Sequence, residues 1–143
     1  MERQAVTARI RAFNRYYTDM LGLLGRYFLK SKFSLTEVRV MYEIAHNAQC
    51  TAKAIRSSMN IDAGYLSRIL AAFSRKGMIE QRPAREDRRF REIELTGKGR
   101  KIFSEIDATQ ERSIENLVER LSDPERDELL IHMERIRELL EKR

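Results

Sequence analysis

Apolar residues recur three or four positions apart over much of this chain, which is the spacing of one face of an α-helix. A first helix is predicted to run to about residue 30. Its apolar stripe comprises Val6, Ile10, Phe13, Tyr17, Leu21, Leu24 and Phe28. A second helix is predicted over Leu35 to His46 after a Ser34 cap, with Val38, Met41, Tyr42 and Ala45 facing inward. A third, shorter helix begins at Thr51, carries Ala54, Ile55 and Met59 inward, and turns at Asn60.

The segment DAGYLSRILAAFSRK, Asp62 to Lys76, has two faces of different chemistry. At about 100° per residue, one side holds Leu66, Ile69, Leu70 and Phe73, and the other holds Gly64, Ser67, Arg68, Ala71 and Arg75. Asp62 can cap the first turn, and Gly77 can take the left-handed conformation that ends a helix. Gly64 costs about 1 kcal/mol of helix stability relative to Ala, which close approach to DNA would explain.

A basic hairpin follows this helix. Met78 to Arg82, ending at Pro83, and Phe90 to Leu95 are predicted to be strands. Five arginines lie in or beside the loop PAREDRR: Arg82, Arg85, Arg88, Arg89 and Arg91. We expect Asp87 to pair with a nearby arginine and hold the loop in shape. An isolated hairpin of this kind would be interpreted as a solvated turn, but after a groove-type helix a DNA-binding wing is favoured.

The excess positive charge is confined to the central third of the chain. Residues 51–100 carry 12 Lys or Arg and six Asp or Glu, whereas the remaining residues carry 16 of each. A pI near 9.7 with this distribution is typical of a protein that binds a polyanion. A membrane surface is the rival partner, but no basic amphipathic helix with a Trp or Phe edge is present. Double-stranded DNA is therefore the predicted partner.

Two further helices are predicted after the hairpin. Thr96 is the expected cap of one that runs through Leu121, with a stripe of Ile102, Phe103, Ile106, Ile114, Leu117, Val118 and Leu121. Ser122-Asp123-Pro124-Glu125 is a capping box with proline in the first turn. The last helix runs to about Leu140 and carries Leu129, Leu130, Met133, Ile136, Leu139 and Leu140.

These patterns predict one mainly α-helical domain over residues 1–143 with a small β-hairpin wing. Residues 34–95 would form a winged helix-turn-helix lobe, and residues 1–30 and 96–143 a helical dimerisation element. The terminal stripes have no second domain to cover, so we expect a homodimer with two-fold related DNA half-sites. A monomer whose terminal helices pack on its own core is the alternative.

The sequence offers little for catalysis. His46 and His132 are the only histidines, and neither has a second ligand at metal spacing. Glu134 and Glu138 lie four apart among arginines, as on a solvated helix face. No apolar run is long enough to cross a membrane, and one cysteine excludes an internal disulfide. We expect a cytoplasmic protein with no enzymatic activity, cofactor or metal site.

The order of these elements, with the motif DRRFREIELTGKG from Asp87 to Gly99, resembles the MarR family of winged helix-turn-helix regulators. Asp87 and Arg89 match the acid and wing-tip arginine of the family's D-x-R signature, and Leu95, Thr96 and Gly99 match the L-T-x-x-G that follows it. Ser34-Leu35-Thr36 and GMIEQRP, Gly77 to Pro83, resemble the entry to the second helix and the exit from the groove helix. The resemblance covers essentially the full chain.

The resemblance implies a homodimer that binds a pseudo-palindromic operator and typically represses transcription. Many relatives release DNA when a small aromatic or phenolic acid binds between the dimer helices and the DNA-binding lobe. The candidate ligand-binding residues here are Arg15, Tyr16, Tyr17 and His46. Cys50 could sense redox state as in some relatives, but those carry the reactive cysteine near the N-terminus, so a buried structural thiol is favoured.

A narrower resemblance links FNRYYTDMLGLL, FSLTEVRVMYEIAH and IDAGYLSRILAAFSRKGMIEQRP to the N-terminal half of proteins that join a MarR domain to a GNAT-type N-acetyltransferase. This chain lacks the acetyl-CoA pyrophosphate loop of that enzyme, so no transferase activity is expected. The chain would be a standalone relative or a separated DNA-binding domain. A third alternative is a winged helix whose cationic face binds an acidic protein.

For DNA we expect base contacts from Ser67 and Arg68, with Tyr65 and Arg75 nearer the phosphates. Arg88 and Arg89 should reach the minor groove or its backbone. The complete set of predicted DNA-binding residues is Lys53, Asp62, Gly64, Tyr65, Ser67, Arg68, Arg75, Arg85, Arg88 and Arg89.

Overall fold

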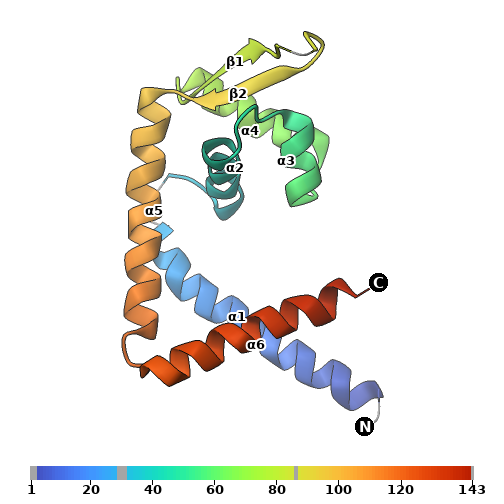
Figure 1. Ribbon diagram of the computed structural model, residues 1–143, viewed down its shortest axis with the longest axis vertical. Helices are drawn as coiled ribbons and strands as arrows, with labels where there is room; N and C mark the ends of the chain where they lie inside the picture. Colours follow the sequence, from blue (N-terminus) through green and yellow to red (C-terminus); the bar gives the residue numbers. More distant parts are fainter. Residues whose placement is uncertain (1–2, 29–31, 86, 143) are drawn as a thin grey trace.

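The computed structural model describes residues 3–28, 32–85 and 87–142, without the side chains of residues 21–28. The predicted stripe positions Leu21, Leu24 and Phe28 therefore lie outside the described side chains. The elements in chain order are α1 (Arg3–Phe28), α2 (Leu35–His46), α3 (Ala52–Met59), α4 (Ala63–Arg75), β1 (Ile79–Pro83), β2 (Arg91–Leu95), α5 (Gly97–Val118) and α6 (Asp123–Glu141) (Figure 1). The predicted fold class, mainly α with one antiparallel hairpin, is confirmed.

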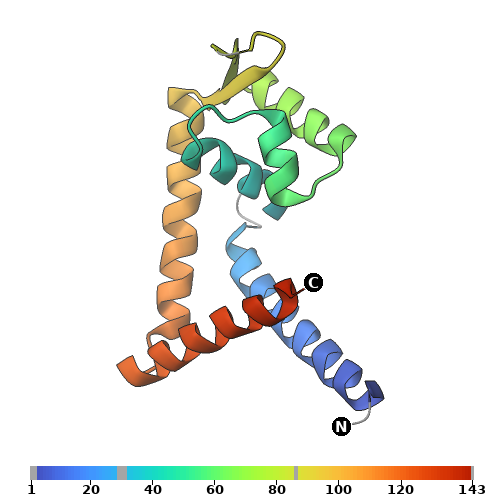
Figure 2. The ribbon, with the colours of Figure 1, turned by 45° about the vertical axis from the view of Figure 1, so that its right-hand side comes forward.

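The molecule has two regions, one toward each end of its longest axis. Helices α2, α3 and α4 and the hairpin form an upper lobe, and α5 runs down from the hairpin (Figures 1 and 2). Helix α1 packs against α5 below this lobe, and α6 leaves the lower end of α5 at a steep angle. The DNA-binding candidates thus lie at one end of the molecule and the chain termini near the other.

Among the side chains that the structure describes, the hydrophobic core lies almost entirely in the upper lobe. The four predicted inward residues of α4 are buried, and the hairpin adds an inward face that packs on them. The buried apolar residues are Val38, Val40, Met41, Ile44, Cys50, Ile55, Leu66, Ile69, Leu70, Phe73, Met78, Ile79, Ile93, Leu95 and Phe103. Phe103 is the contribution of α5 to this core, so α5 joins the lobe through its upper half.

The predicted inner face of α2 is partly wrong. Val38 and Met41 are buried, but Tyr42 and Ala45 are exposed, and Val40 and Ile44 take their place. Helix α2 packs against α3, β2 and α5 at once, so it buries a wider arc than a surface helix would. The ring of Tyr42 instead lies on the surface, stacked 4.0 Å from the ring of His46.

One further burial assignment and two element boundaries differ from the prediction. Ala54 on α3 is exposed, and Ile55 carries the burial of that helix. Phe90 lies outside β2 because its N–H donates to the Asp87 carbonyl and closes a turn. Helix α5 ends at Val118 rather than Leu121, where the Leu121 N–H donates to the Val118 carbonyl in a tight turn.

A compact joint links the end of α4, the base of the hairpin and the start of α5. The Thr96 hydroxyl donates to the Gly77 carbonyl at 2.7 Å, and Lys98 Nζ donates to the Lys76 carbonyl at 2.7 Å. Arg100 reaches back to the Leu95 carbonyl, also at 2.7 Å. Gly99 lies so close to the Met78 carbonyl that any Cβ at this position would overlap it. Position 99 therefore requires glycine for close packing.

The terminal helices leave large apolar side chains in solvent. None of the described residues of α6 is buried, and Leu130 and Leu140 are 60% and 76% exposed. Ile10 and Phe13 of α1 are about half exposed. Among the described helices, none is both long enough and apolar enough to cross a bilayer.

Candidate nucleic-acid interface

Helices α3 and α4 form a helix-turn-helix whose turn and caps are set locally. The Thr51 hydroxyl accepts from the Ala54 N–H at 3.2 Å, and Asp62 Oδ2 accepts from the Tyr65 N–H at 2.8 Å. Asn60 ends α3 in the left-handed conformation, with φ of 49°, which asparagine tolerates better than most residues. These features confirm the predicted turn and the predicted Asp62 cap.

The outer face of α4 is exposed along its whole length. Ser67, Arg68, Ala71 and Arg75 are all in solvent, as predicted. The Arg68 guanidinium lies 5.8 Å from the centre of the Tyr65 ring, within range of a cation–π contact. This contact joins two of the predicted DNA-binding residues on the first two turns of α4.

Gly64 has a local explanation besides approach to DNA. A Cβ at this position would lie 3.2 Å from the capping oxygen of Asp62, which is tighter than an ordinary contact. A side chain at position 64 would therefore disturb the cap of α4. Gly64 leaves the first turn of α4 without a side chain at this position and leaves the Asp62 cap undisturbed.

The wing is braced by one ion pair. Asp87 accepts from the Arg89 backbone N–H at 3.0 Å and from the Arg89 side chain at 2.8 Å. The hydrogen bonds from Arg89 lower the pKa of Asp87, and the same pair raises the pKa of Arg89. The predicted pairing of Asp87 with a nearby arginine is confirmed, and its role in holding the loop in shape stays a prediction. Arg85 and Arg88 extend into solvent on either side of it.

The base of the wing is tied to the start of α3. The Ile93 N–H donates to the Cys50 carbonyl at 2.7 Å, and Thr51 pairs with Glu92 as a single β-bridge. Lys53 Nζ lies 6.0 Å from the centre of the Phe90 ring. The wing is therefore held against the helix-turn-helix by backbone hydrogen bonds, which fixes the spacing of the two candidate DNA-contacting elements.

Cys50 lies where the base of the wing meets the start of α3, and it is only 2% exposed. Burial, with a smaller contribution from Glu43, raises the pKa of its thiol to about 11. Because the thiolate is the reactive form, this thiol is inert near neutral pH. The preference for a structural thiol over a redox sensor agrees with the burial.

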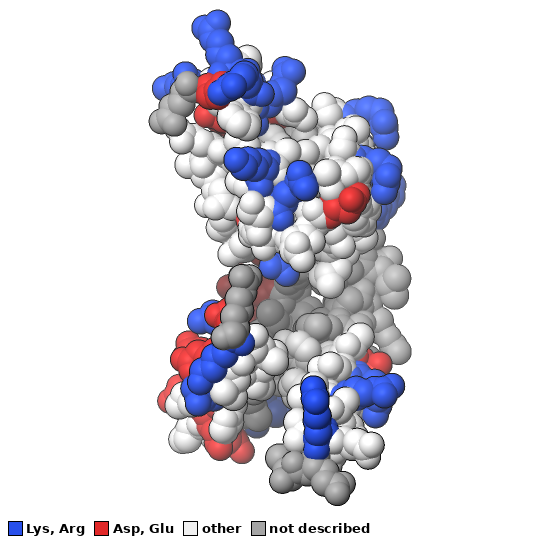
Figure 3. All heavy atoms as spheres, turned by 90° about the vertical axis from the view of Figure 1, so that its right-hand side faces the viewer, with Lys and Arg blue, Asp and Glu red and all other residues white. Residues whose placement is uncertain are grey.

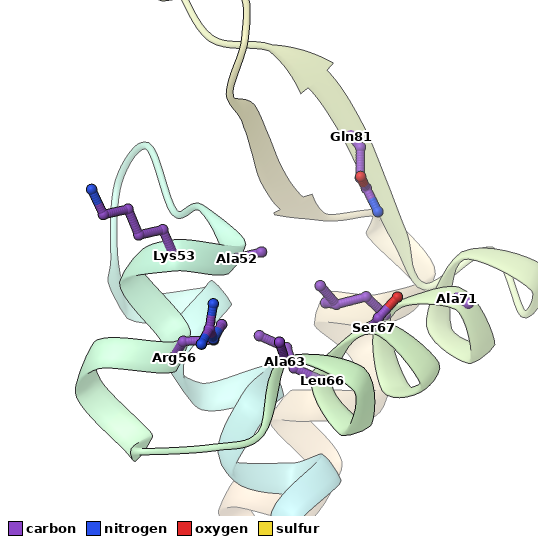
Figure 4. Close-up of a pocket in the computed structure, with 9 residues that line it drawn as sticks. Ala52, Lys53, Arg56, Ala63, Leu66, Ser67, Ala71 and Gln81 are labelled. Carbon is purple, nitrogen blue, oxygen red and sulfur yellow. The ribbon is translucent and has the colours of Figure 1, made fainter.

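A groove of about 460 Å³ opens between α3, α4 and β1 (Figure 4). It is lined by Ala52, Lys53, Arg56, Ala63, Leu66, Ser67, Leu70, Ala71 and Gln81. Lys53 and Ser67 were predicted to contact DNA, whereas Arg56 and Gln81 were not. The strand alternation could have found Gln81, because it shares the inward face of β1 with Ile79.

Basic side chains outnumber acidic ones on the face of the upper lobe that Figure 3 shows. They stand in separate groups among uncharged residues, whereas the surface below mixes acids and bases. The lobe thus presents a face with an excess of positive charge. Such a surface suits the phosphate backbone of a nucleic acid.

The four candidate ligand-binding residues fall into two separate groups. Tyr17 stacks on Phe13 of α1 with ring centres 5.8 Å apart, and Tyr16 is 64% exposed. His46 is at the end of α2, where its ring contacts Tyr42 and Phe103. Within the described part of the chain, no hydrogen bond, ion pair or ring contact joins His46 to Arg15, Tyr16 or Tyr17, so a shared ligand site stays a prediction. The described residues also contain no cluster of His, Cys, Asp or Glu suited to a metal ion.

Comparison with known proteins gives the same architecture. Residues 31–89, less than half of the chain, match the model of the MarR family. No curated protein sequence matches the chain.

Solved structures match over most of the length. Streptococcus pneumoniae FabT in complex with DNA is similar with a TM-score of 0.80 and 21% identity, covering 92% of this chain and 97% of FabT. Wild-type MarR from E. coli in its apo form gives a TM-score of 0.74 and 21% identity over 88% of this chain and 94% of MarR. A mutant E. coli MarR complexed with operator DNA gives 0.76 and 20% over 92% of this chain and 95% of that one. The fold is thus that of MarR-type winged-helix proteins.

Proposed function

We propose that this chain is a MarR-type transcriptional regulator that binds double-stranded DNA in a sequence-specific manner. The observation that carries the proposal is the pairing of two elements in one lobe: a capped α4 with an exposed small and cationic face, and a wing braced by Asp87 and Arg89. A helix of this kind fits the major groove and a guanidinium at a wing tip fits the minor groove. Two structures of similar fold contain DNA.

We further propose that the protein acts as a homodimer. The apolar stripe of α6, together with Ile10 and Phe13 of α1, is exposed in a single chain, and exposed apolar surface of this size is unusual in a stable monomer. A symmetric pair would bury them and would place two α4 helices on half-sites about one helical turn apart. The operator would then be an inverted repeat.

Repression and release by a small aromatic or phenolic acid complete the proposal. A ligand that binds better to the DNA-incompetent spacing of the two lobes shifts the population away from DNA. Arg15, Tyr16, Tyr17 and His46 remain the candidates for such a ligand. A regulator of this type has to reach the chromosomal DNA, so we propose that it is cytoplasmic.

Two alternatives make different predictions. A winged helix that binds an acidic protein would retain the cationic face but have no preferred DNA sequence. A DNA-binding domain separated from a regulator–acetyltransferase fusion would bind an operator in the same way as a standalone regulator. In neither case is enzymatic activity expected of this chain.

The test is selection of preferred sites from a random duplex pool by the purified protein near physiological salt. The proposal expects enrichment of an inverted repeat with half-sites about one helical turn apart. Recovery of no motif, with binding that vanishes as salt rises, would leave only non-specific electrostatics and favour the protein-interaction module.

Two variants then test which residues give DNA binding its sequence specificity. Arg68→Ala should cost about 1–3 kcal/mol on the selected site and relax the preference there, because a base contact is lost. Lys53→Ala should weaken binding to all duplexes alike, because a phosphate contact carries no sequence information. Unchanged affinity and preference in Arg68→Ala would contradict the groove assignment of α4.

A further inference from the structure

The groove between α3, α4 and β1 has opposite walls of different chemistry. Lys53 and Arg56 stand on the α3 wall, whereas Ser67 of α4 and Gln81 of β1 stand on the other side (Figure 4). The apolar part of the lining comes from the small residues Ala52, Ala63 and Ala71 and from the largely buried Leu66 and Leu70. The groove therefore combines an apolar lining with hydrogen-bond donors on both sides.

Three polar groups of the groove have no partner within the described part of the protein. In the described residues, the Arg56 guanidinium, the Ser67 hydroxyl and the Gln81 amide have no hydrogen-bond or ion-pair partner. The hairpin arginines behave differently, because Arg82 pairs with Glu80 at 3.0 Å and Arg89 pairs with Asp87 at 2.8 Å. Three free donors from three separate elements converge on this groove.

Gln81 is the most informative of these residues. Its neighbours Glu80 and Arg82 are exposed on the outward face of β1, whereas Gln81 shares the inward face with Ile79 and pairs in register with Ile93. An amide at this inward position replaces the apolar side chain that a core strand would carry. It is also half-buried, so its orientation is restricted and its donor is directed toward α4 (Figure 4).

We propose that this groove seats one sugar–phosphate strand of the duplex, with Gln81 and Arg56 as phosphate-binding residues. The inference rests on the proposed DNA-binding function. With α4 in the major groove and the wing in the minor groove, the strand that separates the two grooves has to cross between them. Deoxyribose rings pack on the alanine and leucine lining, and phosphate oxygens accept hydrogen bonds from the walls. Gln81 thereby fixes the register of α4 relative to the bases.

A charge series at position 81 provides the first test. In duplex binding at fixed salt, Gln81→Glu should weaken affinity about tenfold or more, and Gln81→Lys should strengthen it. Misfolding cannot produce effects of opposite sign from two substitutions at one position. Glu94→Gln, on the outward face of β2, adds the same unit of charge as Gln81→Lys and should have a smaller effect. Equal effects of Glu94→Gln and Gln81→Lys, or no effect of either Gln81 variant, would overturn the proposal.

A methylphosphonate scan identifies the contacted phosphates. Neutralising single phosphates of the selected duplex should weaken binding of the wild type at specific positions. Gln81→Ala and Arg56→Ala should each become insensitive at one such position, and Arg56→Ala should lower the salt dependence by about one released counterion per half-site. Arg39→Ala, which removes an exposed arginine of α2 outside the groove, should keep every sensitive position.

The outcomes separate the two proposals. If the wild type binds the selected duplex but Gln81→Ala and Arg56→Ala keep its complete methylphosphonate pattern, the seat for the strand is wrong and the regulator function stands. If the wild type binds no duplex, both proposals fail. If inorganic phosphate binds the wild type but not Arg56→Ala, while duplex affinity and the methylphosphonate pattern are the same in both proteins, the groove is a site for small phosphate anions and the strand assignment is overturned.

Discussion

The upper lobe and the terminal helices bury their apolar residues in opposite ways. Phe73, Met41 and Val40 of the lobe are 0% exposed, whereas Leu130 and Leu140 of α6 are 60% and 76% exposed. Both regions have regular helices with an N-terminal cap, Asp62 on α4 and the Ser122–Glu125 capping box on α6, so local helix formation does not distinguish them. What differs is whether the same chain supplies the opposing surface.

This difference predicts that the stability of the lobe and the stability of the proposed dimer depend differently on protein concentration. The lobe packs three helices and a hairpin around its core within one chain, so its folding should not depend on protein concentration. The burial of the α1 and α6 stripes needs a second copy, so the stability of that part should rise with concentration. Each of the following predictions compares one region with the other.

The largest effect is expected in the core of the lobe. Phe73→Ala removes a fully buried ring that contacts Phe33 edge to face, and it should lower the free energy of unfolding by about 3–5 kcal/mol. Chemical denaturation at two protein concentrations measures this loss. Ile131→Ala on α6, where the side chain is 63% exposed, should change stability by no more than about 0.5 kcal/mol. Comparable losses in the two variants would remove the contrast between the regions.

The proposed dimer provides the second comparison. Met133→Glu places a charge in the middle of the exposed α6 stripe and should convert a dimer to a monomer in analytical ultracentrifugation, since an unpaired charge in an apolar interface is strongly unfavourable. Ile131→Glu places the same charge on the opposite face of the same helix and should leave the dimer intact. A wild-type protein that sediments as a monomer, or dissociation by both variants, would contradict the α6 interface.

Helix caps of similar chemistry offer a smaller effect. Asp62→Ala should destabilise the lobe by about 0.5–2 kcal/mol at any protein concentration, because the Tyr65 N–H loses its acceptor. Ser122→Ala removes the hydroxyl that donates to Glu125 at 2.7 Å in the capping box of α6. Its effect should be visible mainly in the concentration-dependent part of the unfolding curve. A concentration-dependent effect of Asp62→Ala would place α4 in the dimer interface instead.

The smallest effect concerns two exposed carboxylates. Hydrogen bonds from Arg89 and from Ser122 lower the pKa of Asp87 and of Glu125 below their ordinary values of 3.8 and 4.5. A depressed folded-state pKa stabilises the protein above the ordinary pKa, and this stabilisation is lost as the pH falls through the folded-state pKa. Carboxyl NMR titration should give midpoints below the ordinary values. Arg89→Ala removes the side-chain hydrogen bonds but keeps the backbone one, so it should raise the pKa of Asp87 toward its ordinary value while leaving Glu125 unchanged.

Much of the lobe could be predicted from the sequence because its signals are local. The Ser34 and Asp62 caps, the left-handed Asn60 and Gly77, and the pairing of Asp87 with an arginine each depend on residues within three positions. Periodicity also predicted the buried face of α4, which meets the core on one side only.

The remaining features depend on distant neighbours. The broad burial of α2 follows from three packing partners, so Val40 is buried where a single-face pattern left it out. Arg56 and Gln81 are 25 residues apart in sequence and share a groove only after the hairpin has folded back over the helix-turn-helix. Their individual positions look ordinary, and only the assembled lobe brings them together.

The joint around Gly99 has a mechanical consequence. Thr96, Lys98 and Arg100 bind the start of α5 to the ends of α4 and β2. The lobe and α5 should therefore rotate together as one rigid unit. The 22 residues of α5 form an arm about 33 Å long at a rise of about 1.5 Å per residue. A rotation of about 10° at its lower end therefore moves the lobe by about 6 Å, roughly the rise of two base pairs. In the proposed homodimer, a small change of angle among the terminal helices would be enough to move each α4 out of register with the major groove of its half-site.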